Sequence, residues 1–128
     1  MCLIPLELNH RIADQPILVY KVLVPIFGNT AETPFMGTRI FFDGEGTAII
    51  KGNLPETHHG VIEEGVHAYR KKGLADYKST WTNGSRVHYA VIPVGGRYFK
   101  GEYDDIVSDK LIVFKTYIDF KNYMKKVQ

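Results

Sequence analysis

The stretch that decides the fold spans residues 62–77 and reads Ile-Glu-Glu-Gly-Val-His-Ala-Tyr-Arg-Lys-Lys-Gly-Leu-Ala-Asp-Tyr. Gly65 interrupts the chain, and residues 66–69 then alternate apolar and polar side chains as a short strand does. Residues 74–77 have the composition of one or two helical turns. A strand followed so closely by a helix has little conformational freedom. This strand–helix arrangement predicts that the side chains of His67, Tyr69 and Arg70 lie close together.

The rest of the chain predicts strands. Residues 17–24 are rich in β-branched side chains and almost free of polar ones, which is typical of a central strand covered on both faces. Further strands are expected at residues 2–8 (an edge strand, because it contains Pro5), 36–43, 47–51, 87–94 and 107–117. The Gly44-Glu45-Gly46 turn predicts a hairpin between two of them.

A short helix is expected at the end of the sequence, where Asp119 can cap it and apolar side chains from Phe120 to Val127 fall on one face. The sequence therefore predicts one α+β domain covering residues 1–128. Its sheet is expected to be mainly antiparallel, with one short central helix and one short C-terminal helix.

Composition excludes several classes of protein. Apolar residues make up 45% and charged residues 23% of the 128 residues, an ordinary balance for a soluble globular domain. The formal charge of +2 is too small to indicate bulk nucleic-acid binding. Cys2 is the only cysteine, which excludes an internal disulfide and fits a reducing compartment. With no apolar run of about 20 residues and no signal-peptide pattern, the protein is expected to be cytoplasmic and not to bind membranes.

Two basic segments indicate possible binding chemistry. The run Arg70-Lys71-Lys72 precedes the predicted helix, where it either holds a phosphate or forms a solvated surface. The glycine-bounded segment at residues 95–101 carries Arg97, Tyr98 and Lys100. It can stack a base and pair a phosphate, or it can be a hairpin turn with ordinary aromatic packing.

Histidine and tryptophan leave alternatives open. His67 can donate a proton, contact a ligand or fix a turn through a backbone bond. Trp81 can cover the core or act as a stacking platform. His58 and His59 point to opposite sides of an extended chain, so no metal site is expected, and neither a cofactor nor a catalytic residue is predicted. The predicted ligand-binding residues are His67, Tyr69, Arg70, Trp81, Arg97, Tyr98 and Lys100.

Short motifs add a resemblance. The chain contains Tyr-Lys-Val-Leu at residues 20–23, Ile-x-x-Gly-x-His-Ala-Tyr at 62–69, Ile-Pro-x-Gly-x-x-Tyr at 92–98 and Val-Ser-x-x-Leu at 107–111. In this order the motifs resemble a group of small uncharacterised proteins encoded by bacteriophages and by gut and other bacteria. Where that group usually has Gly-Phe-His, this chain has Val66 before the histidine. The resemblance covers residues 17–115, and it implies a phage or mobile-element setting in a bacterial host and no particular activity.

Three hypotheses for function follow. The first is a non-enzymatic binding protein that sequesters an anionic, nucleotide-like small molecule or blocks a host protein, and so counteracts host immunity. The second is a nucleotide-acting enzyme similar to ADP-ribosyltransferases, in which Tyr20, Lys21 and Glu102 would take part. The third is a protein-protein adaptor. A homodimer formed through the edge strands at residues 2–8 or 110–117 is a further expectation.

Overall fold

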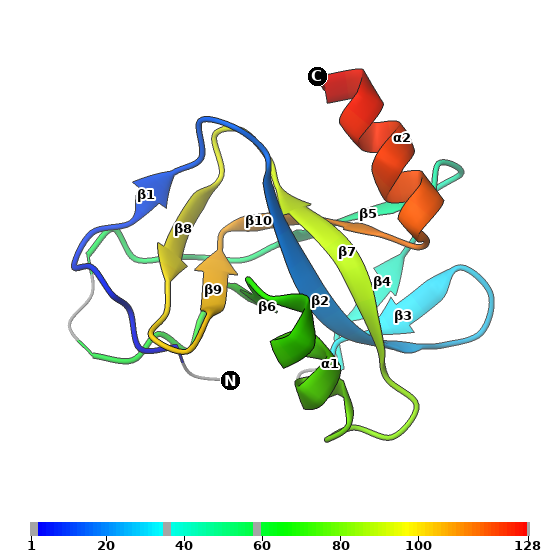
Figure 1. Cartoon of the computed structure of the whole chain (residues 1–128), viewed down its shortest axis with the longest axis horizontal. Coiled ribbons are helices and arrows are strands. Elements are labelled where there is room, and N and C mark those ends of the chain that lie inside the picture. Colours follow the sequence, from blue (N-terminus) through cyan, green and yellow to red (C-terminus); the bar gives the residue numbers. More distant parts are fainter. Residues whose placement is uncertain (1–2, 35–36, 58–59, 128) are drawn as a thin grey trace.

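The computed structural model describes residues 3–34, 37–57 and 60–127. Within these residues the chain forms ten strands and two helices (Figure 1). The strands are β1 (Arg11–Ile12), β2 (Ile17–Pro25), β3 (Thr30–Glu32), β4 (Arg39–Phe41), β5 (Thr47–Lys51), β6 (Val66–Tyr69), β7 (Arg86–Ile92), β8 (Arg97–Lys100), β9 (Asp105–Ser108) and β10 (Lys110–Phe114). The helices are α1 (Lys72–Ser79) and α2 (Tyr117–Val127).

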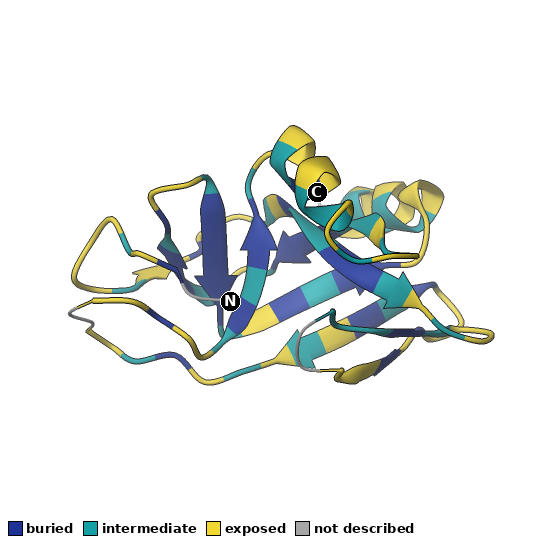
Figure 2. Ribbon diagram, turned by 90° about the horizontal axis from the view of Figure 1, so that it is seen from below, coloured by how far each residue is buried: buried dark blue, intermediate teal, exposed yellow. Residues whose placement is uncertain are grey.

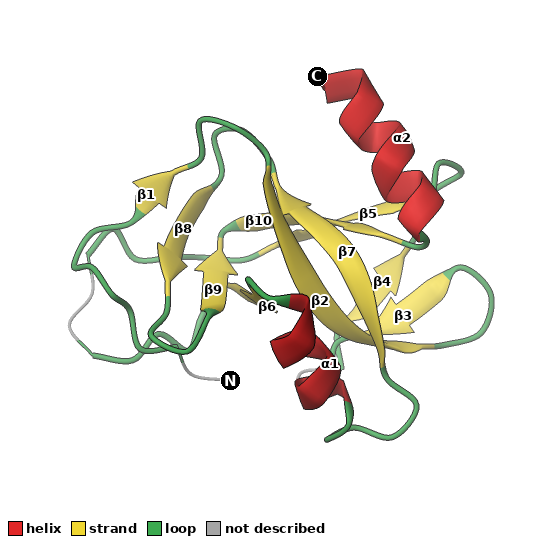
Figure 3. Cartoon of the chain, viewed as in Figure 1, coloured by secondary structure: helices red, strands yellow, loops and turns green. Residues whose placement is uncertain are grey.

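Every strand pairing is antiparallel, and the strands follow the order β1-β8-β9-β6-β2-β7-β10-β5. Strand β3 pairs with the end of β2 and with β4. Figure 3 shows strands dominating the chain, with α1 in the middle of the sequence and α2 at its C-terminal end. The predicted α+β fold, mainly an antiparallel sheet with one central and one C-terminal helix, is therefore confirmed.

Strand β2 lies in the centre of the sheet, as residues 17–24 predicted. It pairs with β7 from Ile17 to Leu23, and its own side chains alternate between two apolar surroundings. Val19 and Leu23 face the main core, and Val22 faces α1. A strand rich in β-branched residues suits this position because most of its side chains are buried or half-buried, with Leu18, 40% exposed, as an exception.

The sheet curls around one main core, to which most strands contribute alternate residues as the period of two requires. The buried members of this core are Ala13, Val19, Leu23, Ala31, Ile40, Phe42, Ala48, Val66, Ala68, Ala90, Ile92, Tyr98, Ile106, Leu111 and Val113. Figure 2 shows these strand segments as buried and both helices on the outside of the sheet, mostly exposed or intermediate.

The helices cover the outer face of the sheet at two places. Ala75 of α1 packs on Val22 and Tyr69, so this helix is anchored where β2 and β6 meet. Helix α2 packs through rings: Phe120 stacks on Tyr89 of β7 with a centroid distance of 5.2 Å. Further aromatic contacts attach α2 to the sheet, and the helix has no fully buried residue.

Five local predictions differ from the structure. Within residues 3–8, Leu3 and Pro5 form only isolated bridges and no strand, because proline lacks the N–H that a continuous ladder needs. The single strand predicted at residues 107–117 is two strands separated by Asp109. Residues 95–101 are not only a turn, because β8 occupies Arg97–Lys100.

The hairpin predicted around Gly44-Glu45-Gly46 closes with two backbone bonds, from Asp43 N–H to the Thr47 carbonyl and from Gly46 N–H to the Asp43 carbonyl. Beyond the turn, β5 pairs with β10 instead of β4. The C-terminal helix begins at Tyr117, before the predicted cap Asp119, and Thr116 provides the cap. In the hairpin long-range pairing outweighs the local pattern, and at the helix start a neighbouring polar side chain does so.

Candidate functional site

The candidate site lies where β2 changes partners. On the edge away from β7, Tyr20 pairs with Tyr69 of β6, whereas Val24 and Pro25 pair with β3. Residues 21–23 between these pairings have no strand beside them on that edge among the described residues. We call this opening, from Tyr20 to Val24, the β2 fork. A split between neighbouring strands opens a path from the surface toward the core, as binding sites require.

Lys21 occupies the β2 fork. Its strand position is on the same side as Val19 and Leu23, which are core residues, so the ammonium is drawn in among apolar side chains. It donates a 2.6 Å hydrogen bond to the carbonyl of His67. No carboxylate forms an ion pair with it in the described part of the chain, and burial lowers the pKa of Lys21 to about 8.

His67 lies beside Lys21 and is neutral at pH 7, because burial lowers its pKa below the usual value. Its Nε2 is 3.1 Å from the carbonyl oxygen of Glu63, which can only accept, so Nε2 carries the proton. Nδ1 is then an acceptor. It is buried and has no hydrogen-bond partner among the described residues. An unpaired buried acceptor of this kind suits a donor group of a ligand.

Two adjoining cavities share Lys21, Pro34 and His67 as walls. The smaller has a volume of about 70 Å³, and its described lining residues include two cations, Lys21 and Lys78, and no carboxylate. The larger has a volume of about 310 Å³ and is lined in part by Thr38, Ile50 and Glu64. The cavities differ in charge: the smaller favours an anion, and the larger offers both apolar surface and acceptors.

Lys78 and Trp81 form the outer wall of the smaller cavity. The Lys78 ammonium lies 3.6 Å from the centroid of the Trp81 ring, which is close enough for a cation–π interaction. Trp81 follows α1 directly, contacts Tyr77 edge-on and remains 58% exposed. It is therefore no cover of the core. Of the two interpretations of Trp81, this placement favours an exposed platform beside the cavity.

Three of the predicted site residues come together here, since His67, Tyr69 and Trp81 all line the smaller cavity. Tyr69 stays protonated because burial, with Asp105 opposite it, raises its pKa to about 12. The basic residues Arg70, Lys71 and Lys72 line neither cavity. Arg70 and Lys71 both form ion pairs with Asp104, and Lys72 pairs with Asp76.

The other predicted residues lie on β8, away from this cleft. Arg97 forms an ion pair with Asp109 at 3.0 Å and lines a separate hollow beside Lys51 and Lys110. Tyr98 is buried in the main core, and Lys100 is half-buried on the same strand. The structure therefore divides the seven predicted residues and gives β8 no place in the cavities around Lys21.

Sequence reasoning did not predict Lys21 or Lys78 as ligand-binding residues, and it considered Lys21 only for the enzyme hypothesis. Lys21 is a single charged residue inside the apolar run of residues 17–24. It lies two residues from both Val19 and Leu23, so its side chain is on the same face of the strand as these core residues. A lysine at a core position of a central strand is a signal in itself, because burial of an unpaired charge is costly. Nothing local marks Lys78, since its role depends on where α1 ends.

Comparison with known proteins gives no further assignment: no family model matches, and no similar curated protein or solved structure was found. Neither helix of the described chain combines the length and apolar character needed to cross a membrane. Among the described residues no three His, Cys, Asp or Glu side chains gather closely enough to hold a metal ion. His58 and His59, the histidines considered for a metal, lie outside the described residues.

Proposed function

We propose that the protein is a non-enzymatic binding protein for a small anionic ligand of nucleotide-like chemistry, held in the β2 fork. The observation that carries this proposal is the Lys21 ammonium, drawn into a largely apolar cavity without a carboxylate partner in the described chain. A buried lysine destabilises a fold unless it is paired, and an anionic ligand supplies the missing partner.

Each of the two cavities binds a chemically different part of the ligand. A phosphate or carboxylate occupies the smaller cavity between Lys21 and Lys78, whose ammonium groups donate charge-assisted hydrogen bonds. The remainder of the ligand extends into the larger cavity, where Glu64 and the free Nδ1 of His67 accept hydrogen bonds from N–H or O–H groups. At about 310 Å³ this cavity is at the lower end of known ligand sites, which favours a mononucleotide over larger molecules.

The sequence resemblance suggests a biological role for such binding. In a phage or mobile element, a cytoplasmic protein of this kind would counteract host immunity by sequestering a nucleotide signal of the bacterium. Sequestration requires affinity and no turnover, which agrees with a cavity built from lysines, an aromatic platform and a neutral histidine.

The proposal is tested by native mass spectrometry of the purified protein, followed by calorimetric titration with a matched panel. The panel contains nucleoside monophosphates, the corresponding nucleosides and inorganic phosphate. We expect a nucleoside monophosphate to bind and its nucleoside to bind far more weakly. Lys21→Met should weaken binding about 10- to 100-fold, the loss expected for one charge-assisted hydrogen bond.

Lys125→Met is the matched control, because it removes an exposed lysine from the last turn of α2, far along the chain from the cleft. Trp81→Ala should also weaken binding, since it removes the aromatic wall that holds Lys78. If nucleosides bind as well as nucleotides, or if Lys21→Met binds as well as the parent protein, the proposed site is wrong. A protein that binds no member of the panel and co-purifies with a host protein would favour the adaptor hypothesis.

A further inference from the structure

Strands β4 and β5 face each other with edges that no described residue pairs. The Gly44-Glu45-Gly46 turn connects them as in a hairpin. The bond from Asp43 N–H to the Thr47 carbonyl closes the end of the hairpin next to this turn, where the two strands are closest. A regular hairpin would continue by pairing Phe41 with Ile49 and then Arg39 with Lys51. Neither pair is formed: in the described structure β4 pairs only with β3, and β5 only with β10.

The direction of the free backbone groups follows from the neighbouring ladders. Phe42 N–H bonds to the Asn29 carbonyl, so even-numbered residues of β4 bond to β3. Gly52 N–H bonds to the Asp109 carbonyl, so even-numbered residues of β5 bond to β10. The N–H and C=O groups of the odd-numbered residues therefore point into the space between the strands. These residues are Arg39, Phe41, Ile49 and Lys51.

This space is an open groove of about 290 Å³, lined by Thr38–Phe41 and Ala48–Lys51. Two large apolar side chains stand beside it on the outer face: Phe41 is 67% exposed and Ile49 is 61% exposed. Isolated apolar side chains on a surface are ordinary, but here they flank two free strand edges. Unpaired edges next to apolar side chains are the structural requirement for strand addition.

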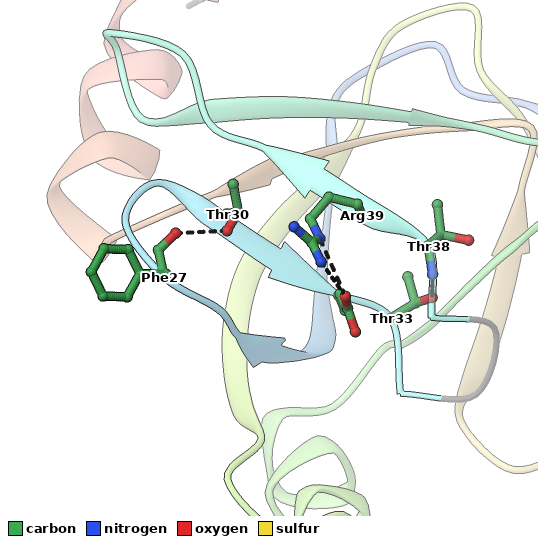
Figure 4. Close-up of polar contacts among 6 residues, drawn as sticks. Phe27, Thr30, Thr33, Thr38 and Arg39 are labelled. Carbon is green, nitrogen blue, oxygen red and sulfur yellow. Dashed lines mark hydrogen bonds and ion pairs between the residues drawn. The ribbon is translucent and has the colours of Figure 1, made fainter.

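Charge marks the wide end of the groove. Lys51 is the cross-strand partner of Lys110, and both are exposed. Like charges placed opposite each other in a sheet repel, and neither lysine forms an ion pair within the described chain. Arg39, at the same end, is already neutralised by Glu32 at 2.9 Å (Figure 4). The wide end thus carries two lysines that form no ion pair among the described residues, although Glu63 and Glu64 line the larger cavity together with Lys51.

We propose that this groove, the β4–β5 groove, binds an extended peptide segment of a partner protein by strand addition. The peptide pairs its backbone with Phe41 and Ile49. Its alternate apolar side chains pack on the exposed ring of Phe41 and the exposed methyl groups of Ile49. A carboxylate of the peptide lies between Lys51 and Lys110. The groove borders the larger cavity and shares Thr38, Ile50 and Lys51 with it. Phe41 and Ile49 distinguish the two sites, because they line the groove and neither cavity around Lys21.

The test selects binders from a random heptapeptide library and measures a synthetic copy of the best one. We expect alternating apolar residues with Asp or Glu near one end. Bound peptide should slow hydrogen exchange of the Phe41 and Ile49 amides by about tenfold or more, because free edge amides exchange from the native state. Ile49→Pro should abolish binding, since it removes the groove-facing N–H and leaves the ladder bonds of Ala48 and Ile50 intact.

Ile49→Val is the matched control, because it keeps both the amide and an apolar side chain. Lys51→Glu should weaken binding of the acidic peptide. Lys125→Glu makes the same charge change on α2 and should leave this binding unchanged. The proposal is overturned if Ile49→Pro binds like the parent protein or if the peptide protects amides around Lys21 instead. It is also overturned if the free protein is a dimer in which the Phe41 and Ile49 amides are already protected.

Discussion

The ammonium of Lys21 and the backbone carbonyl of His67 are joined by a 2.6 Å hydrogen bond across the β2 fork. The bond links β2 to β6 just after their ladder ends at Tyr20 and Tyr69. One carbonyl only partly replaces the hydration of a cation, and burial accordingly lowers the pKa of Lys21 to about 8. The fold therefore tolerates a costly group at this position, as binding sites often do.

Replacing this lysine should stabilise the protein. Lys21→Met keeps the length of the side chain and removes the buried charge, and we expect the free energy of unfolding at pH 7 to rise by about 1–2 kcal/mol. The gain is smaller than the full pKa shift implies, because the His67 carbonyl loses its partner. Urea denaturation of the two proteins measures the difference.

The same comparison has a defined pH dependence. The folded pKa of Lys21, about 8, lies below the ordinary value of 10.5, so the unfolded chain binds more protons between these pH values. The stability of the parent protein should therefore rise relative to Lys21→Met as pH increases from 8 to 10. A stability difference that stays constant over this range would show that the ammonium is not buried.

Two histidines should make the fold sensitive to acid. Burial lowers the pKa of both His67 and His88, and the Nδ1 of His88 is 2.9 Å from the Phe114 carbonyl. The unfolded chain binds protons near the ordinary pKa of 6.5, whereas the folded protein resists them, so stability is lost as pH falls below 6.5. Thermal denaturation between pH 7.5 and 5 measures this loss.

Amide side chains provide the control for this prediction. Gln at position 67 and Asn at position 88 place a neutral N–H near the bonded ring nitrogen, so His67→Gln and His88→Asn should each flatten the pH profile. Carboxylates contribute to acid unfolding in every variant. The prediction therefore concerns the difference from the parent protein, and identical profiles would contradict it.

The sequence predicted the elements that depend on local pattern. Strand β2 and the β6–α1 unit have the expected type and nearly the expected ends, because periodicity and composition act within a few residues. Pairing was harder to predict. The turn at residues 44–46 is present, yet β5 joins β10, a strand about 60 residues later in the chain. Nothing within the hairpin sequence marks that choice.

The candidate site was predicted only in part for the same reason. His67, Tyr69 and Trp81 lie near one another in the sequence, and the β6–α1 unit brings them together. Arg97 and Lys100 looked equally suitable by chemistry, but their strand lies two places from β6 in the sheet, on the far side of β9. Which basic residues share a cavity depends on strand order, which residue types do not encode.

Gly65 should be irreplaceable for a conformational reason. Its φ of +85° favours glycine, and a Cβ there would lie 2.7 Å from side-chain carbons of both Leu54 and Val107. We expect Gly65→Ala to lower the free energy of unfolding by about 2–4 kcal/mol, combining backbone strain with overpacking. Chemical denaturation of the variant measures the loss.

Gly73 provides the matched control within the same segment. It lies in the first turn of α1, and a Cβ there would meet no atom within 4 Å. Gly73→Ala should therefore stabilise the protein by about 0.5–1 kcal/mol through helix propensity. Equal effects of the two substitutions would contradict the proposed role of Gly65 as the required start of β6.

The start of α2 depends on a reciprocal pair of side chains. The Asp119 carboxylate accepts bonds from the N–H and hydroxyl of Thr116, and the Thr116 hydroxyl lies 3.3 Å from the Asp119 N–H. This arrangement is a capping box, with aspartate in place of the usual glutamate. Thr116→Ala should lower the free energy of unfolding by about 1 kcal/mol.

The loss should be local, because beyond its first residue, Tyr117, helix α2 is also attached through the rings of Phe120 and Tyr123. Hydrogen exchange in Thr116→Ala should therefore accelerate at the first residues of α2 and remain unchanged in β2. Asn122→Ala, an exposed substitution in the same helix, is the control and should not reduce stability, because alanine has the higher helix propensity. If the two variants were equally stable, Thr116 would not be the residue that fixes where the helix begins.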